Sequence, residues 1–188
     1  MGLHRAWPDA EITGVDIKPM PRYPFNFIQA DAMEFPLDGY DFIWASPPCQ
    51  AYSEATPIAA RAKHPDLIAA IRERLVSTGK PYTIENVDCA RHLMLDPIML
   101  CGTMFGLRVW RHRWFEISPQ NLQLRPPCRH NEHPVVVSGS AHGRGEAKVP
   151  EMIRAMDVPW MDVRSEIRQA IPPAYSEFIA RQFSLWSQ

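Results

Sequence analysis

The stretch YDFIWASPPCQ, residues 40–50, constrains the fold of this chain more than any other part of its sequence. Its first half is apolar and aromatic, which predicts a short buried strand. Pro47 and Pro48 then remove two backbone donors and restrict φ, so regular strand pairing has to stop there. Cys49 therefore follows the carboxyl end of a strand. In open α/β sheets, ligands bind at that edge.

Strand and helix signals alternate through the first half of the chain, as they do in a parallel α/β sheet. An amphipathic helix is predicted over residues 65–80, with Gly79 at its C-terminal end. The last helix is expected to begin after Pro172 and Pro173, and another helix before it, near residues 151–158. Strands are predicted over residues 11–17, 25–31, 40–46, 81–87 and 111–118, with a shorter candidate over 133–140.

Composition excludes several classes of protein. No stretch approaches the roughly 18 apolar residues that a membrane span needs, and no signal peptide is evident, so we expect a cytoplasmic protein without membrane contact. The net charge of −1 does not indicate a nucleic-acid-binding protein. Contacts with DNA would have to come from local clusters such as RVWRHRW, residues 108–114.

The four cysteines have no spacing typical of a disulfide framework. Cys89 and Cys101 have apolar neighbours, which favours buried small hydrophobic side chains. Cys128, His130 and His133 are spaced so that one loop could offer three zinc ligands, but structural zinc takes four and no fourth is evident. We therefore predict an ordinary polar loop without a metal, and metal binding by these three residues is the alternative.

Three short motifs are expected to meet at one edge of the sheet: SPPCQ after one strand, ENV (residues 85–87) at the end of the next, and RHR (residues 111–113) at the start of a later one. Neighbouring strands lie less than about 5 Å apart, so groups at their ends can reach one small substrate. A thiol, a carboxylic acid and two arginines suit nucleophilic attack on an electron-poor ring.

This set of motifs resembles the DNA (cytosine-5-)-methyltransferase family, in particular its compact, phage-type members. GVDIKP and ADA resemble the two strand ends that contact the family's cofactor, and IPPAYSEFIARQ resembles its closing helix. The resemblance implies an α/β fold with the Rossmann-like sheet of class I methyltransferases and helices on both faces. It also implies a catalytic core over residues 1–118, a very small target-recognition segment over 119–165, and a C-terminal helix over 166–188 that returns to the core.

The resemblance implies transfer of a methyl group from S-adenosylmethionine to carbon 5 of cytosine in double-stranded DNA. Cys49 would attack ring carbon 6, protonated Glu85 would donate toward ring nitrogen 3, and Arg111 and Arg113 would hold the cytosine, a phosphate or the catalytic loop. The implied cofactor-binding residues are Asp16, Ile17, Asp31, Ala32 and Pro48, and the implied DNA-contacting residues are Gln50, Ser53 and Asn86.

Some of these residues have simpler interpretations. An acid after a strand, such as Asp16 or Asp31, is often a helix cap or a turn residue. The basic residues of the loop after Cys49, which are Arg61, Lys63 and His64, are also common on an ordinary solvated surface.

The chain departs from the family pattern at its start. MGLHRAW looks like the helix that follows the family's first strand and glycine-rich cofactor turn, and both of these are missing. A sheet without that central strand leaves backbone groups unpaired on its neighbours. We expect that the natural protein begins earlier, that the neighbouring strands close up, or that self-association or a partner chain supplies a strand. Val109 and the pair Arg168-Gln169 also differ from the family's usual residues.

Two other functions stay open. In the first, the chain is a catalytically silent DNA-binding remnant. In the second, it is one part of a split methyltransferase that needs a partner. The target sequence, expected to be short, is not defined, and transfer of a modified one-carbon group is compatible with the same attack on the ring.

Overall fold

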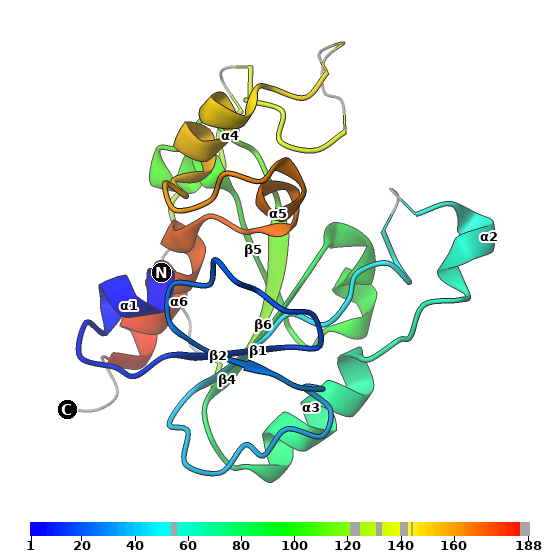
Figure 1. The fold of residues 1–188 in the computed structure, drawn as a ribbon, viewed down its shortest axis with the longest axis vertical. Coiled ribbons are helices and arrows are strands. Elements are labelled where there is room, and N and C mark those ends of the chain that lie inside the picture. The colour runs from blue at the N-terminus through cyan, green and yellow to red at the C-terminus, as the bar shows by residue number, and fades with distance from the viewer. Residues whose placement is uncertain (54–55, 121–124, 131–132, 140–142, 144, 185–188) are drawn as a thin grey trace. The chain divides into compact units, whose positions relative to one another are not determined.

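The computed structural model describes residues 1–53, 56–120, 125–130, 133–139, 143 and 145–184. The protein has a mixed α/β fold (Figure 1). The chain divides into two compact units. Unit 1 comprises Met1–Phe35, Cys101–Arg111 and Gln123–Gln188, and unit 2 comprises Pro36–Leu100 and His112–Leu122. The chain passes from unit 2 to unit 1 after Leu100 and returns to unit 2 after Arg111.

Unit 2 contains a mixed sheet of four strands in the order β3-β4-β6-β5. Strands β3 and β4 are parallel, with Ala45 opposite Ile84, whereas β6 is antiparallel to both β4 and β5. All five residues of β4 are buried, because this strand has a neighbour on either side. The strands span β3 (Ile43–Ala45), β4 (Tyr82–Asn86), β5 (Ile98–Leu100) and β6 (Arg113–Ser118).

Helix α3 (Ile68–Ser77) lies against this sheet (Figure 1). It packs there with one apolar stripe. Ile68, Ile71 and Leu75 are buried at helical spacing, which confirms the stripe expected from the sequence. Gly79 lies just after the helix with φ of +65°, a left-handed conformation that glycine adopts at little cost. Unit 2 also contains α2 (Ile58–Arg61) and the 3₁₀ helix η1 (Asp88–Leu93).

A buried ion pair joins the elements of unit 2. Arg72 on α3 donates two hydrogen bonds to the Glu116 carboxylate on β6, at 2.7 and 2.6 Å. The same carboxylate accepts bonds from the Tyr82 hydroxyl and the Leu95 amide, and Arg72 also donates to the Leu93 carbonyl. Every oxygen of this buried acid therefore has a partner, as a charge in a protein interior requires. The hydrogen bonds to Glu116 raise the pKa of Arg72.

Unit 1 contains a two-stranded parallel sheet and the helices of both chain ends. Strand β1 (Thr13–Asp16) pairs with β2 (Asn26–Gln29), with Asp16 opposite Gln29. Helix α1 (Gly2–Ala6) lies beside α6 (Pro173–Ser184) (Figure 1). A Cβ atom at Gly2 would come within 2.1 Å of the Pro173 carbonyl oxygen, so this close approach requires glycine.

The main core of unit 1 lies around helix α4 (Val149–Met156) and α5 (Arg164–Gln169). Met152 and Met156 from α4 and Ile167 from α5 are fully buried there. The 3₁₀ helix η2 (Gly102–Phe105) belongs to the same unit. Val109 is buried in this core, so the residue that departs from the family pattern serves packing here. The remaining buried members of this cluster are Val135, Val137, Ala155 and Val158.

Two expectations about strands need correction. The single sheet expected from the sequence is divided into two sheets in the described residues, and no ladder joins β1 or β2 to the other four strands. The candidate strand over residues 133–140 is wrong, because the described part of this segment, 133–139, contains no strand. Val135 and Val137 are buried by side-chain packing in the core of unit 1, so their apolar pattern reflects that core and not a sheet.

The strands predicted around residues 11–17, 25–31, 40–46, 81–87 and 111–118 are confirmed, as are the three helices expected from the sequence. Among the described residues, no helix is both long enough and apolar enough to cross a membrane.

Candidate functional site

Cys49 lies in a tight turn just beyond β3, at the carboxyl end that this strand shares with its parallel neighbour β4. The Cys49 carbonyl oxygen accepts hydrogen bonds from the amides of Tyr52, at 3.0 Å, and Ser53, at 2.8 Å. Its side chain is partly exposed. The turn therefore holds a free thiol at the sheet edge within reach of solvent, which is where a nucleophile has to be placed.

Glu85 lies at the end of the neighbouring strand β4 and is 9% exposed. Its carboxylate oxygen Oε1 lies 3.0 Å from Nε of Arg113, the first residue of the antiparallel strand β6. Both side chains are largely buried, so the ion pair fixes the direction of the carboxylate. The carboxyl end of β4 and the start of β6 thus place a carboxylate and a guanidinium side by side.

Asn86 links the proline turn to β4. Its side-chain Nδ2 donates to the Pro47 carbonyl at 3.1 Å, and its Oδ1 accepts from the Val87 amide at 2.9 Å. The residue is only 2% exposed. Because prolines 47 and 48 have no amide hydrogen, this side-chain bond replaces the backbone pairing that stops at the end of β3. The contact with DNA predicted for Asn86 stays a prediction, and the structure gives it a partner within the protein.

The loop after Cys49 folds back on the start of α3. The Tyr52 hydroxyl donates to Oδ1 of Asp66, which also accepts a bond from the Ile68 amide. Burial raises the pKa of Tyr52, and the bond to Asp66 raises it further. Pro48 and Gln50 are exposed and Ser53 is partly exposed. Three of the residues predicted to contact cofactor or DNA are therefore open to solvent beside the thiol.

In unit 1, two acids follow the parallel strands β1 and β2. Asp16 ends β1, and its carbonyl accepts a bond from the Ala30 amide at 3.1 Å, so Asp31 comes directly after the paired strand ends. One carboxylate oxygen of each acid closes a local turn, by accepting from the amides of Lys18 and Met33, both at 2.8 Å. The simpler interpretation as turn residues thus holds for one oxygen of each acid.

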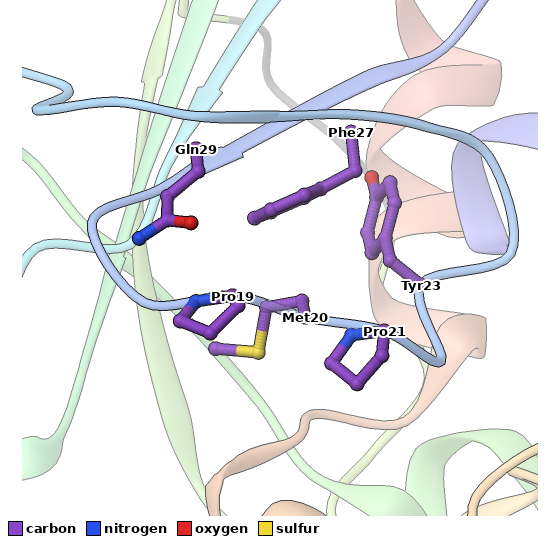
Figure 2. Close-up of a pocket in the computed structure, with 6 residues that line it drawn as sticks. All are labelled: Pro19, Met20, Pro21, Tyr23, Phe27 and Gln29. Carbon is purple, nitrogen blue, oxygen red and sulfur yellow. The ribbon is translucent and has the colours of Figure 1, made fainter.

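An open hollow of about 480 Å³ lies between the loop after β1 and strand β2. Figure 2 shows Phe27 and Gln29 on one side of it and prolines 19 and 21 on the other. Gln29 also donates to the Ile17 carbonyl at 3.1 Å, which connects the hollow with a predicted cofactor residue. Ile17 is 67% exposed, so its apolar surface is available to a ligand. Ala32, the last of these residues, is exposed as well.

Arg111 belongs to unit 1, whereas Arg113 belongs to unit 2. Nη2 of Arg111 donates to the Arg168 carbonyl at 2.5 Å, and the Arg111 carbonyl accepts from the Tyr175 hydroxyl at 2.8 Å. These contacts join the segment before β6 to α5 and α6. Arg168 also pairs with Glu146 at 3.2 Å. The structure thus places Arg113 beside Glu85 and gives Arg111 partners within its own unit.

A third cluster, in unit 1, differs from the one expected from the sequence. The ligand atoms of Cys101, Cys128 and His130 all lie within 4.8 Å of one another, while His133 is exposed and does not belong to the group. Cys101 is fully buried, as expected, and burial raises the pKa of its thiol. Its sulfur nevertheless has polar neighbours. Sequence spacing could not find Cys101, because the fold brings it to a loop far along the chain.

No model of a known protein family matches this chain, and no curated protein matches it at a significant level.

Proposed function

We propose that this protein transfers a methyl group from S-adenosylmethionine to carbon 5 of cytosine in double-stranded DNA through a covalent adduct with Cys49. The observation that carries the proposal is the arrangement at one edge of the unit 2 sheet. There a partly exposed thiol follows strand β3, and a nearly buried carboxylate lies near the end of β4. The guanidinium paired with this carboxylate belongs to the first residue of β6.

The chemistry needs a nucleophile and an acid that act on the same ring. Glu85 first takes up a proton from solvent, and the Cys49 thiolate then adds to carbon 6 of cytosine while Glu85 gives that proton to ring nitrogen 3, which leaves carbon 5 electron-rich. S-adenosylmethionine, when bound, would supply the methyl group, whose bond to the sulfonium sulfur would break as the bond to carbon 5 forms, with S-adenosylhomocysteine as the second product. A water molecule then takes the proton from carbon 5, the bond to Cys49 breaks, and nitrogen 3 returns its proton to Glu85.

Arg113 and Asn86 are positioning residues in this scheme. The Arg113 guanidinium, 3.0 Å from the carboxylate, aims Glu85 along the sheet edge. The Asn86 amide holds the Pro47 carbonyl and therefore the turn that carries Cys49. A misplacement of about 1 Å can cost roughly 100-fold in rate, so we expect both residues to affect the rate of the chemical step.

The residues of unit 1 suit the adenosine part of the cofactor. Acids at the ends of parallel strands commonly bind ribose hydroxyls, and Asp16 occupies such a position. The exposed Ile17 and the hollow beside Gln29 offer apolar surface for a flat base. Asp31 would accept a hydrogen bond from the adenine amino group. These residues fit the cofactor's chemistry. The observation that supports this is the open apolar hollow, because its lining residue Gln29 donates to the Ile17 carbonyl.

A cytosine in duplex DNA is stacked and has to leave the helix before a thiol can reach carbon 6. The loop after Cys49 carries Gln50, Ser53 and the basic residues Arg61, Lys63 and His64, which suit contact with the flipped base and its flanking phosphates. The Tyr52–Asp66 bond fastens the start of this loop to the residues just before α3.

The experiment that tests the proposal follows transfer of labelled methyl groups from S-adenosylmethionine to duplex DNA, together with covalent trapping on DNA that contains 5-fluorocytosine. Cys49→Ala should abolish both signals because it removes the nucleophile. Glu85→Gln should lower the transfer rate by about 10²- to 10⁴-fold, the usual contribution of a general acid. Matched controls are Cys89→Ala, in η1, and Glu73→Gln, on an exposed position of α3.

Trapping that persists in Cys49→Ala would disprove the assignment of the nucleophile. If the native chain binds DNA yet neither transfers label nor becomes trapped, the catalytic proposal fails and a DNA-binding role without catalysis remains. A DNA affinity that does not change with rising salt would contradict contact with phosphates and hence DNA as the substrate.

The division of the strands favours a second candidate, in which the chain is one component of a two-part methyltransferase. Strands β1 and β3 are each the end strand of a separate sheet in the described residues, and an end strand can pair with a strand from another chain. Calorimetric titration with S-adenosylmethionine separates the candidates. Micromolar binding by the isolated chain supports an enzyme that acts alone, whereas binding only after self-association or addition of a partner supports the two-part enzyme.

A further inference from the structure

The cluster formed by Cys101, Cys128 and His130 has the composition and spacing of a metal site. Nε2 of His130 lies 3.1 Å from the Cys128 sulfur and 3.4 Å from the Cys101 sulfur. With Zn–S bonds of about 2.3 Å and Zn–N bonds of about 2.0 Å, a sulfur and a nitrogen on one tetrahedral zinc ion lie about 3.5 Å apart. The cluster therefore needs only small shifts to surround such an ion.

His130 is already oriented for this role. Its imidazole stacks on the Trp110 ring, with centroids 4.0 Å apart and an angle of 7° between the planes. Stacking of this kind restricts rotation of the ring while leaving its edge, which carries Nε2, directed at the two sulfur atoms. An imidazole whose direction is fixed before binding loses little freedom when it takes up a metal.

Thr103 supplies support around the two sulfur atoms. Its hydroxyl lies 3.2 Å from the Cys101 sulfur and 3.9 Å from the Cys128 sulfur, and it accepts a bond from the Arg129 amide at 3.3 Å. One side chain of η2 thus contacts both candidate thiolates and the backbone between Cys128 and His130. Residues bonded to metal ligands in this way commonly fix the ligands' orientation.

A fourth ligand is available along the chain. The Cys101 sulfur lies 2.9 Å from the Trp110 carbonyl oxygen, and His112 follows Trp110 by two residues. Consecutive Cα atoms are about 3.8 Å apart, so the chain keeps His112 close to the cluster. We propose that Cys101, Cys128, His130 and His112 bind one zinc ion. Two thiolates and two imidazoles in a tetrahedron are a donor set that zinc prefers.

The site would have a structural role, because four protein ligands leave no open position for a substrate. It would join the loop around Cys128 to the segment Cys101–Arg111, two parts of unit 1 that are distant in the sequence. On binding, each cysteine gives up its proton to solvent and the two thiolates donate electron pairs to Zn²⁺, so no oxidant or reductant is needed. The site shares no residue with the proposed methyl-transfer site and does not depend on it.

The test uses the full chain without an affinity tag, purified without chelators. Elemental analysis should find about one zinc ion per chain. After removal of zinc, titration with Co²⁺ should give the visible absorption of tetrahedral Co²⁺ and a thiolate charge-transfer band that saturates at one equivalent. Cys128→Ser and His112→Asn should each weaken Co²⁺ binding by more than about 100-fold, because changes next to a ligand already cost about 10- to 100-fold.

Two variants serve as matched controls. His133→Asn removes an exposed imidazole from the same loop, and Cys89→Ser removes a thiol in unit 2, so both should bind Co²⁺ like the native chain. A folded native chain with less than one tenth of an equivalent of zinc and no thiolate band would overturn the proposal. Unchanged Co²⁺ affinity in Cys128→Ser would do so too. Native affinity in His112→Asn alone would overturn the assignment of the fourth ligand.

Discussion

At the level of single residues, the turn that carries Cys49 depends on the amide of Asn86. This amide is 2% exposed and bonds to both the Pro47 carbonyl and the Val87 amide. In Asn86→Ala the buried Pro47 carbonyl and the partly buried Val87 amide both lose their bond, which should lower the free energy of unfolding by about 1–3 kcal/mol. Urea unfolding measures this change. The rate of trapping on 5-fluorocytosine DNA should fall as well, because the thiol is less well positioned.

Asn26→Ala is the matched control, since Asn26 donates to Glu11 at 2.9 Å on an exposed strand. Surface substitutions of this kind usually change stability by less than about 0.5 kcal/mol. Equal losses in the two variants would show that the Asn86 bonds have no special weight in the turn.

For individual residues, the sequence predicts positions along the strands better than it predicts partners. The two prolines predict that a strand ends before Cys49, and in the structure β3 ends at Ala45. The partner of Glu85 depends on the antiparallel register of β6, which no local pattern in the sequence reveals. The apolar neighbours of Cys101 predict only a buried hydrophobic residue. Its polar contacts arise from a loop that the fold brings back to it.

At the level of elements, the Arg72–Glu116 pair joins α3 to β6. The two side chains are 17% and 3% exposed. In Glu116→Gln, the charge of Arg72 loses its partner in the interior, which should destabilise the protein by about 3–5 kcal/mol in urea unfolding. The exposed pair Arg181–Glu177 on α6 has a similar separation of 2.7 Å, but its side chains are 60% and 25% exposed. Glu177→Gln should therefore cost only about 0.3–0.5 kcal/mol.

A loss in Glu116→Gln no larger than that in Glu177→Gln would mean that solvent reaches the Arg72–Glu116 pair and screens it. The double variant Arg72→Met with Glu116→Gln provides a further check. Because it leaves no unpaired charge in the interior, it should recover part of the stability that the single substitution loses.

Most elements could be predicted because their apolar residues follow a regular period. Strands β1 to β4 and helices α3 and α6 combine such runs with proline or glycine at their ends. The sequence does not predict strand β5, because three residues are too few to show a period. The valines near residue 136 predict a strand because β-branched residues favour strands, yet in the structure they pack against helix α4 and its neighbours. The division into two sheets depends on long-range pairing.

At the level of the whole molecule, stability should decline in alkali because each unit contains a tyrosine that resists ionisation. Burial raises the pKa of Tyr23 in unit 1 and, together with Glu116, that of Tyr82 in unit 2. A raised pKa favours the neutral phenol in the folded state. The neutral phenol of each tyrosine therefore makes its full contribution to the stability of the folded state below about pH 10, the pKa of an unfolded tyrosine. This contribution is lost as the pH rises beyond that value.

Urea unfolding at pH 8 and at about pH 11 measures the effect. Tyr82→Phe should reduce the loss of stability between the two pH values, because phenylalanine has no proton to release. An unchanged pH dependence in Tyr82→Phe and Tyr23→Phe would show that other groups control the alkaline transition.

The interleaving of the two units has a consequence for how the protein is made. A ribosome delivers residues in chain order, and unit 2 is complete once Leu122 has emerged, whereas unit 1 still lacks everything from Gln123 onward. Helix α1 is synthesised before unit 2, and its partner α6 is synthesised after it. Since domains generally fold as units during synthesis, unit 2 should fold first, while α1 waits until α6 has been synthesised before it can pack.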